Sequence, residues 1–185
     1  MLKKTFFLSA VLLSALSGQA QAVTLNADGQ WNAFDVDDSV SNSGGLEWID
    51  FNNDALSFDF TLTGSAILKV VDGGFAGDRF QVFDNGSLLD QTSVAVNSYP
   101  DGVGLDFDAA FANTNFSRGV FLLGAGSHSI TGLLSQSALD DTNSALNATI
   151  GAVSLTAVPV PAAAWLYMTG AGLMSLVSRR RKSKV

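Results

Sequence analysis

The sequence predicts an all-β fold, an antiparallel β-sandwich of jelly-roll-like form, over residues 23–157. Short runs rich in β-branched and aromatic residues recur along this region, and Gly-rich turns separate them. One run alternates strictly between apolar and polar side chains, and no stretch keeps a sustained helical period. Two sheets that bury their alternating apolar faces against each other account for this pattern.

The clearest strand is 56–63, where the period of two places Leu56, Phe58, Phe60 and Leu62 on one face, which we expect to be core. The segment 105–112 fits either a strand or a helical turn. Asn85-Gly86 predicts a type I′ hairpin turn, because both residues accept positive φ angles. The other strand-like runs are 31–36, 46–51, 66–71, 79–83, 119–123, 127–133 and 149–156.

Charge is sharply segregated along the 185 residues. Residues 23–157 hold all 17 acidic side chains and only Lys69, Arg79 and Arg118, a net charge of 3 minus 17, or −14. This charge disfavours binding to nucleic acid and to an anionic membrane. Cysteine is absent, which excludes disulfides, thiolate metal sites and a cysteine nucleophile.

Residues 1–22 have the three parts of a secretory signal peptide. Lys3 and Lys4 precede the apolar run 6–16, and the small residues Ala20 and Ala22 follow it. This pattern predicts export through the secretion translocon and cleavage by signal peptidase after Ala22.

The C-terminal tail, 158–185, predicts a membrane anchor. Residues 162–178 carry no charge, and a helix of that length spans roughly 26 Å, near the lower limit for a bilayer core. The basic residues that follow predict a cytoplasmic end, and they are Arg179, Arg180, Arg181 and Lys182. Pro159 and Pro161 keep the preceding segment extended, so a protease or transpeptidase has access to it.

This tail resembles the PEP-CTERM sorting domain, in the variant whose signature is Val-Pro-x-Pro-Ala-Ala-Ala-Trp-Leu. The matching residues are Val158, Pro159, Val160, Pro161, Ala162, Ala163, Ala164, Trp165 and Leu166. The resemblance implies an inner-membrane precursor in a Gram-negative bacterium, recognition by exosortase, cleavage near the Pro motif, and association with exopolysaccharide or biofilm at the cell surface or in the extracellular matrix. Val160 replaces the glutamate of the name-giving Pro-Glu-Pro, so the scissile bond stays undefined.

Residues 77–86 and 121–130 resemble the extracellular β-sandwich domains that often precede this tail. That resemblance implies a fold and brings no catalytic residue with it. His128 is the single histidine, and strand alternation separates it from Ser127 and Ser129. A hydrolase would have to pair His128 with a distant serine and aspartate, or place two acids across a cleft. We therefore expect a protein without enzymatic activity.

Acidic residues in expected loops supply the hard oxygen ligands that calcium prefers. No segment matches an EF-hand, so a structural Ca²⁺ is a hypothesis beside the simpler interpretation of solvated acids. Its candidate ligands are Asp35, Asp37, Asp38, Asp50 and Asp54.

Aromatic side chains on a surface bind sugars by stacking, and the candidates are Trp31, Trp48 and Tyr99. Both tryptophans lie in strand-like runs and are also core candidates, whereas Tyr99 precedes Pro100 in a turn. The sequence thus predicts an exported surface or matrix component. The alternatives are a carbohydrate-binding module on the same scaffold and, third, an extracellular hydrolase.

Overall fold

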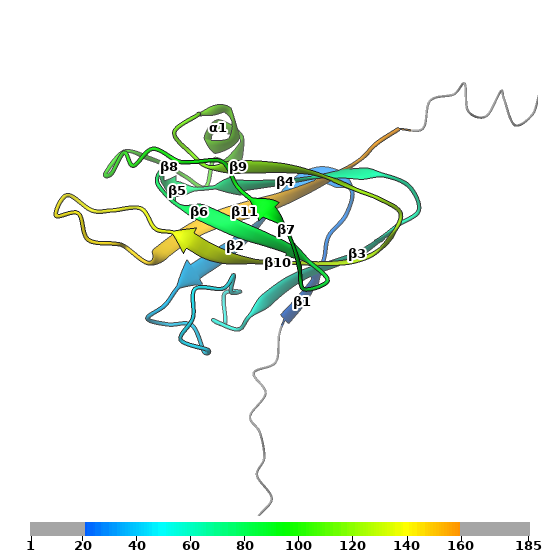
Figure 1. Ribbon diagram of the computed structural model, residues 1–185, viewed down its shortest axis with the longest axis horizontal. Helices are drawn as coiled ribbons and strands as arrows, with labels where there is room; N and C mark the ends of the chain where they lie inside the picture. The colour runs from blue at the N-terminus through cyan, green and yellow to red at the C-terminus, as the bar shows by residue number, and fades with distance from the viewer. Residues whose placement is uncertain (1–20, 160–185) are drawn as a thin grey trace, which may run out of the picture.

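The computed structural model describes residues 21–159, which form two sheets packed face to face and a small two-stranded sheet beside them (Figure 1). The strands are β1 (Gln21–Thr24), β2 (Asp28–Asp37), β3 (Leu56–Leu62), β4 (Ala66–Asp72), β5 (Gly74–Phe75), β6 (Arg79–Asp84), β7 (Ser87–Gln91), β8 (Gly102–Gly104), β9 (Arg118–Leu123), β10 (Gly126–Gln136) and β11 (Ala148–Ala157). The one helix of this region is α1 (Phe107–Ala112). The chain is therefore mostly β, as the sequence predicts.

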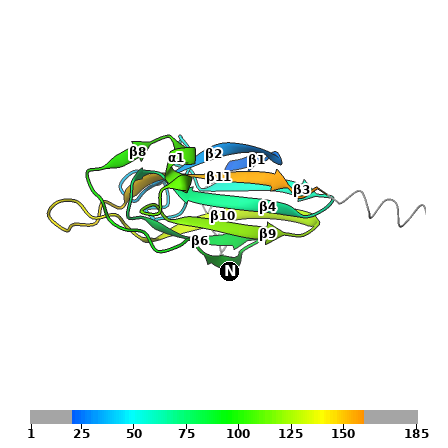
Figure 2. The same ribbon diagram turned by 90° about the horizontal axis from the view of Figure 1, so that it is seen from above.

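The five-stranded sheet has the order β1-β3-β10-β6-β7, and the four-stranded sheet has the order β2-β11-β4-β9. All neighbours are antiparallel except β1 and β3, which are parallel. The strands of both sheets run along the long axis of the molecule (Figures 1 and 2). This is the packing of a β-sandwich.

The main core lies between the two sheets. In β3 the buried side chains are Leu56, Phe58 and Phe60, the predicted core face, while Leu62 is partly buried against them. β4 supplies Leu68 and Val70 from the opposite sheet. The residue period of two therefore sets which face of each strand is buried.

Two glycines make room for the largest rings of this core. Trp48 stacks on Phe34 with ring centroids 3.9 Å apart. A methyl group at Gly132 would overlap the Trp48 ring, and one at Gly151 would overlap the Phe34 ring. Each ring thus lies flat on a strand whose backbone carries no side chain at that point.

The predicted strand 46–51 is wrong in one respect, because this segment makes only isolated bridges. Trp48 N–H donates to Gly132 O of the five-stranded sheet at 3.0 Å, whereas Ile49 N–H donates to Asp35 O of the four-stranded sheet at 2.8 Å. A segment whose successive backbone groups bond to different sheets cannot extend a ladder on either. It closes one open edge of the sandwich instead.

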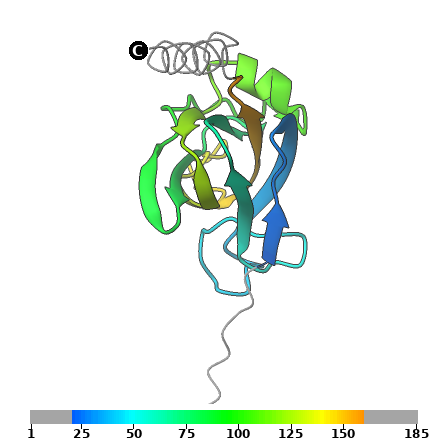
Figure 3. The ribbon, with the colours of Figure 1, turned by 90° about the vertical axis from the view of Figure 1, so that its right-hand side faces the viewer.

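Helix α1 covers the outer face of the four-stranded sheet, outside the sandwich (Figure 3). Its Phe107 and Ala110 pack on Val71 and Ala152 in a second apolar cluster. Asp106 caps the helix, since its side chain accepts a hydrogen bond from Ala109 N–H at 3.0 Å. The ambiguous segment 105–112 is thus a short helix.

The hairpin between β6 and β7 turns at Asn85-Gly86, whose φ angles are +50° and +76°. These are the positive values that a type I′ turn requires, so the predicted hairpin is confirmed.

Both ends of the described chain are attached to the sandwich. At the start, Gln21 N–H donates to Ala55 O at 2.8 Å, and Ala22 of the predicted signal cleavage site lies in β1. At the end, Val158 N–H donates to Ser65 O at 2.9 Å. Within residues 21–159 no helix has the length and apolar character to cross a bilayer. The predicted membrane helix 162–178, the basic cluster and most of the signal peptide lie outside the described residues.

Candidate functional site

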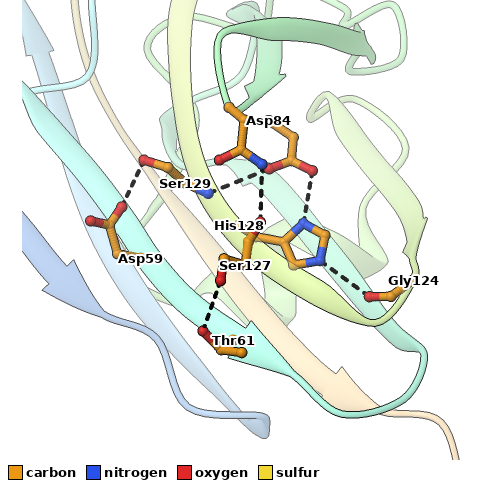
Figure 4. A network of polar contacts seen from close by, with 8 residues as sticks. Asp59, Thr61, Asp84, Gly124, Ser127, His128 and Ser129 are labelled. Atoms are coloured by element: carbon orange, nitrogen blue, oxygen red, sulfur yellow. Dashed lines mark hydrogen bonds and ion pairs between the residues drawn. The ribbon is translucent and has the colours of Figure 1, made fainter.

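An open polar depression lies at the end of the five-stranded sheet where β3 ends and β10 begins (Figure 4). Its volume is about 520 Å³, within the size range of small-molecule sites. Polar and apolar surface contribute about equally to its lining, which consists of Thr24, Asp59, Phe60, Thr61, Asn85, Ser127, His128 and Ser129. We refer to these eight residues as the polar depression.

The antiparallel register of β3 and β10 brings its polar side chains together. Asp59 lies opposite Ser129, and Thr61 lies opposite Ser127. Ser129 Oγ donates to Asp59 Oδ1 at 2.7 Å, and the hydroxyls of Thr61 and Ser127 are 3.3 Å apart. Both pairs therefore stand on rigid, hydrogen-bonded strands.

The β6–β7 turn completes one side of the polar depression. Asn85 Nδ2–H donates to Ser127 O at 3.0 Å, which holds the turn against β10. The positive φ of Asn85 is tolerated because asparagine is among the residues that adopt this conformation most readily. A turn required by the fold thus also positions an amide group at the site.

His128 points to the opposite face of β10 from Ser127 and Ser129 (Figure 4). Its Nδ1 lies 2.8 Å from Asp84 Oδ2, its Nε2 lies 3.1 Å from Gly124 O, and its ring stacks on Phe60. A backbone carbonyl can only accept, so the Nε2 bond needs a proton on that nitrogen.

This geometry does not form a Ser–His–Asp triad. Ser129 Oγ donates to Asp59, and the ring nitrogens of His128 contact Asp84 and Gly124. A general base must hold a free nitrogen lone pair within reach of the serine hydroxyl. His128 acts here as a bridge between the end of β6 and the β9–β10 turn.

The three aromatic residues suggested as ligand-binding side chains differ in their burial and contacts. The suggestion that Trp48 binds a ligand is wrong, because its side chain is 1% exposed and stacks in the core. Trp31 is half-buried against Phe107 and Phe111 of α1, and its Nε1–H donates to Asp108 at 2.8 Å. Tyr99 is half-buried at the surface. Its ring lies edge-on to that of the exposed Phe75, with the two ring centroids 4.9 Å apart.

The acids suggested as calcium ligands are held mostly by their own loops. Asp37 accepts from Ser39, Asp50 from the backbone of Asn52 and Asp54, and Asp38 and Asp54 accept from asparagine amides. Burial and the nearby charge of Asp37 raise the pKa of Asp35. Among residues 21–159, no three carboxylate or histidine groups gather as a metal cluster.

Two acids outside that set are far more buried, namely Asp72 at 0% and Asp78 at 1% exposure. Burial, with the charge of Asp78, raises the pKa of Asp72 to about 9 despite three opposing backbone hydrogen bonds. Burial also raises the pKa of Asp78 to about 6. The sequence carries no signal for this, since Ala138 and Thr149, which bond to Asp78, are distant along the chain.

No family model and no curated protein matches the sequence. Among solved structures, the chain is similar to the pre-peptidase C-terminal domain of a collagenase from Bacillus anthracis, with a TM-score of 0.39, 8% identity, and coverage of 75% of this chain and 95% of that one. It is also similar to the C-terminal CBM6 of LamC, a marine laminarinase from Zobellia galactanivorans, with a TM-score of 0.28, 14% identity, and coverage of 68% and 100%. Likenesses this distant carry no argument about the ligand, which has to come from the site.

The polar depression combines hydrogen-bond donors and acceptors with little charge. Asp59 is its one acidic residue, and the His128 side chain is turned to the other face of β10, where it contacts Asp84. Asp59 uses one carboxylate oxygen for Ser129, and its other oxygen makes no hydrogen bond within residues 21–159. Such a surface suits a ligand with several adjacent hydroxyl groups.

Proposed function

We propose that this protein is an exported, non-catalytic β-sandwich that binds a neutral polysaccharide at the cell surface or in the extracellular matrix. The observation that carries the proposal is the polar depression, a concave site with carboxylate, hydroxyl and amide groups on rigid strands. Sugars are recognised by a few such polar groups that fix their orientation.

The charge of the site selects the class of glycan. Asp59 lies in the depression, and residues 23–157 carry a net charge of −14. Both features repel a polymer of uronic acids or sulfated sugars. A neutral glycan donates its hydroxyl protons to Asp59 and accepts from Asn85 and the serine hydroxyls.

The first prediction concerns Asp59. We expect Asp59→Ala to weaken binding to a neutral glucan by about tenfold or more, since a hydrogen bond to a charged group contributes roughly 1.5–3 kcal/mol. Affinity electrophoresis in gels that contain a neutral glucan, with a polyuronate gel beside it, measures the effect. The matched control is Asp90→Asn, an exposed acid on β7 outside the depression.

Tyr99→Ala distinguishes the two surface candidates. The Phe75–Tyr99 pair lies outside the residues of the polar depression, so we expect this variant to bind normally. Loss of binding in Tyr99→Ala together with normal binding in Asp59→Ala would move the sugar site to that pair. If the wild-type protein binds none of the neutral glycans tested, the proposal as a whole is contradicted.

The delivery route is a separate part of the proposal and is supported by the resemblance of residues 158–185 to the PEP-CTERM sorting domain. We propose that exosortase processes an inner-membrane precursor near the Pro motif, and that the released domain meets exopolysaccharide outside the cell. Deleting the exosortase gene of the host should leave the larger precursor in the membrane fraction. A mature mass and location that stay the same by mass spectrometry and fractionation would refute this route.

A further inference from the structure

Asp72 and Asp78 are two buried carboxyl groups with no basic partner within residues 21–159. Asp72 ends β4, and Asp78 directly precedes β6. The three basic side chains of the described region make other contacts, Lys69 with the Phe111 ring, Arg79 with Thr92 O and Arg118 with Phe111 O. A buried carboxylate without a counter-charge is costly, so this pair either keeps a proton or binds a cation.

One oxygen of Asp72 lacks any partner. Asp78 N–H donates to Asp72 Oδ2 at 3.2 Å, and the nearby backbone N–H groups of Gly73 and Gly77 lower the pKa of the same carboxyl. Asp72 Oδ1 is buried and makes no hydrogen bond as donor or acceptor in the described chain. This unpaired oxygen can hold a proton or bind a cation.

Uncharged oxygens lie beside the pair. Thr149 bonds to the Asp78 carboxylate, and its Oγ1 lies 3.5 Å from Ile150 O. Ile150 O in turn accepts from Gly73 N–H at 2.9 Å, and a side chain at Gly73 would lie 2.9 Å from that same oxygen. Thr149 and Ile150 of β11 therefore bring a hydroxyl and a carbonyl oxygen beside the Asp72–Asp78 segment.

We propose that Asp72 and Asp78, with the neighbouring oxygens of Thr149 and Ile150, bind one Ca²⁺ ion that fastens the β4–β6 connection to β11. Calcium accepts mixed carboxylate and carbonyl ligands in flexible geometry. Magnesium keeps several waters, and carboxylates at 0% and 1% exposure leave little room for them. Two negative charges match one divalent ion, whereas a buried water would satisfy Oδ1 without balancing them.

The test uses the full-length chain in mild detergent, stripped with a chelator and titrated with CaCl₂ alone. We expect one Ca²⁺ per chain by equilibrium dialysis, with a Kd in the range of about 10⁻⁴–10⁻³ M found for extracellular modules. At a hundredfold excess over Kd, the melting temperature should rise by about 5–10 °C. Asp72→Asn and Asp78→Asn should lose both effects, while the exposed Asp141→Asn keeps them.

Each outcome of these measurements either supports or overturns the proposed calcium site. Asparagine is neutral and close in shape to a protonated aspartate, so both variants should fold, and circular dichroism checks this. If a variant does not fold, dialysis of the wild type still decides, because less than half an ion per chain at about 5 mM calcium overturns the site. A calcium-induced shift that survives in folded Asp72→Asn also overturns it. The site is independent of the polar depression, so loss of glycan binding has no bearing on it.

Discussion

Trp48→Ala is expected to lower the free energy of unfolding by about 3–5 kcal/mol, the usual cost of removing a large buried ring. Trp48 is 1% exposed, stacks on Phe34 and meets Phe58 and Phe80 edge-on. Its removal leaves a cavity where the two sheets and segment 46–51 meet. Urea unfolding monitored by far-UV circular dichroism measures the change.

Gly132→Ala provides a matched test of the same contact. Its new methyl group overlaps the Trp48 ring, and overpacking of this kind costs about 1–3 kcal/mol. In the double variant Trp48→Ala/Gly132→Ala the cavity accepts the methyl group, so the second substitution should cost little or nothing. Strict additivity of the two changes, or a Trp48→Ala effect below about 1 kcal/mol, would show that this packing is not what stabilises the sandwich.

The second large effect is a loss of stability with rising pH in the calcium-free chain. Asp72 and Asp78 have their pKa values raised by burial to about 9 and about 6, against an ordinary 3.8. Between the ordinary and the raised pKa the folded chain binds more protons than the unfolded chain, so the free energy of unfolding falls as pH rises. Each carboxyl contributes a slope approaching about 1.4 kcal/mol per pH unit, Asp78 up to about pH 6 and Asp72 up to about pH 9.

Urea unfolding in the presence of a chelator at pH values from 5 to 9 measures this slope. Asp72→Asn should remove the part above about pH 6, because asparagine does not titrate. Asp141→Asn, an exposed acid, should leave the curve as it is. Stability that stays flat or rises between pH 6 and 9 in the wild type would contradict the prediction. Excess calcium should reverse the trend, since it binds the ionised carboxylates.

The strands could be predicted where local pattern and burial agree. In β3 the alternation of side chains is also the alternation of core and surface, and at Asn85-Gly86 the turn is set by the residues themselves. The short strands β1, β5 and β8 depend on pairing partners elsewhere in the chain, so no local pattern marks them. Segment 46–51 resembles a strand because Trp48 is buried, yet its backbone bonds are split between two sheets.

The site was less predictable than the fold. Alternation correctly separates His128 from Ser127 and Ser129, but the Asp59–Ser129 pair depends on the register of β3 against β10, which one sequence does not reveal. Clusters of acidic residues in the sequence point to exposed loops as metal sites. The buried acids Asp72 and Asp78 lie outside such clusters, in a glycine-rich segment. Burial of a charged group depends on which distant elements cover it.

The hydrogen bond from Val158 to Ser65 has a steric consequence for any processing enzyme. It ties Val158, the first residue of the proposed sorting motif, to the folded body, so no spacer separates the sandwich from that motif. Fully extended, the residues from Val158 to Pro161 reach only about 10 Å. If exosortase cuts there, as proposed above, its active site has to come within about 10 Å of the end of the sandwich around Ser65.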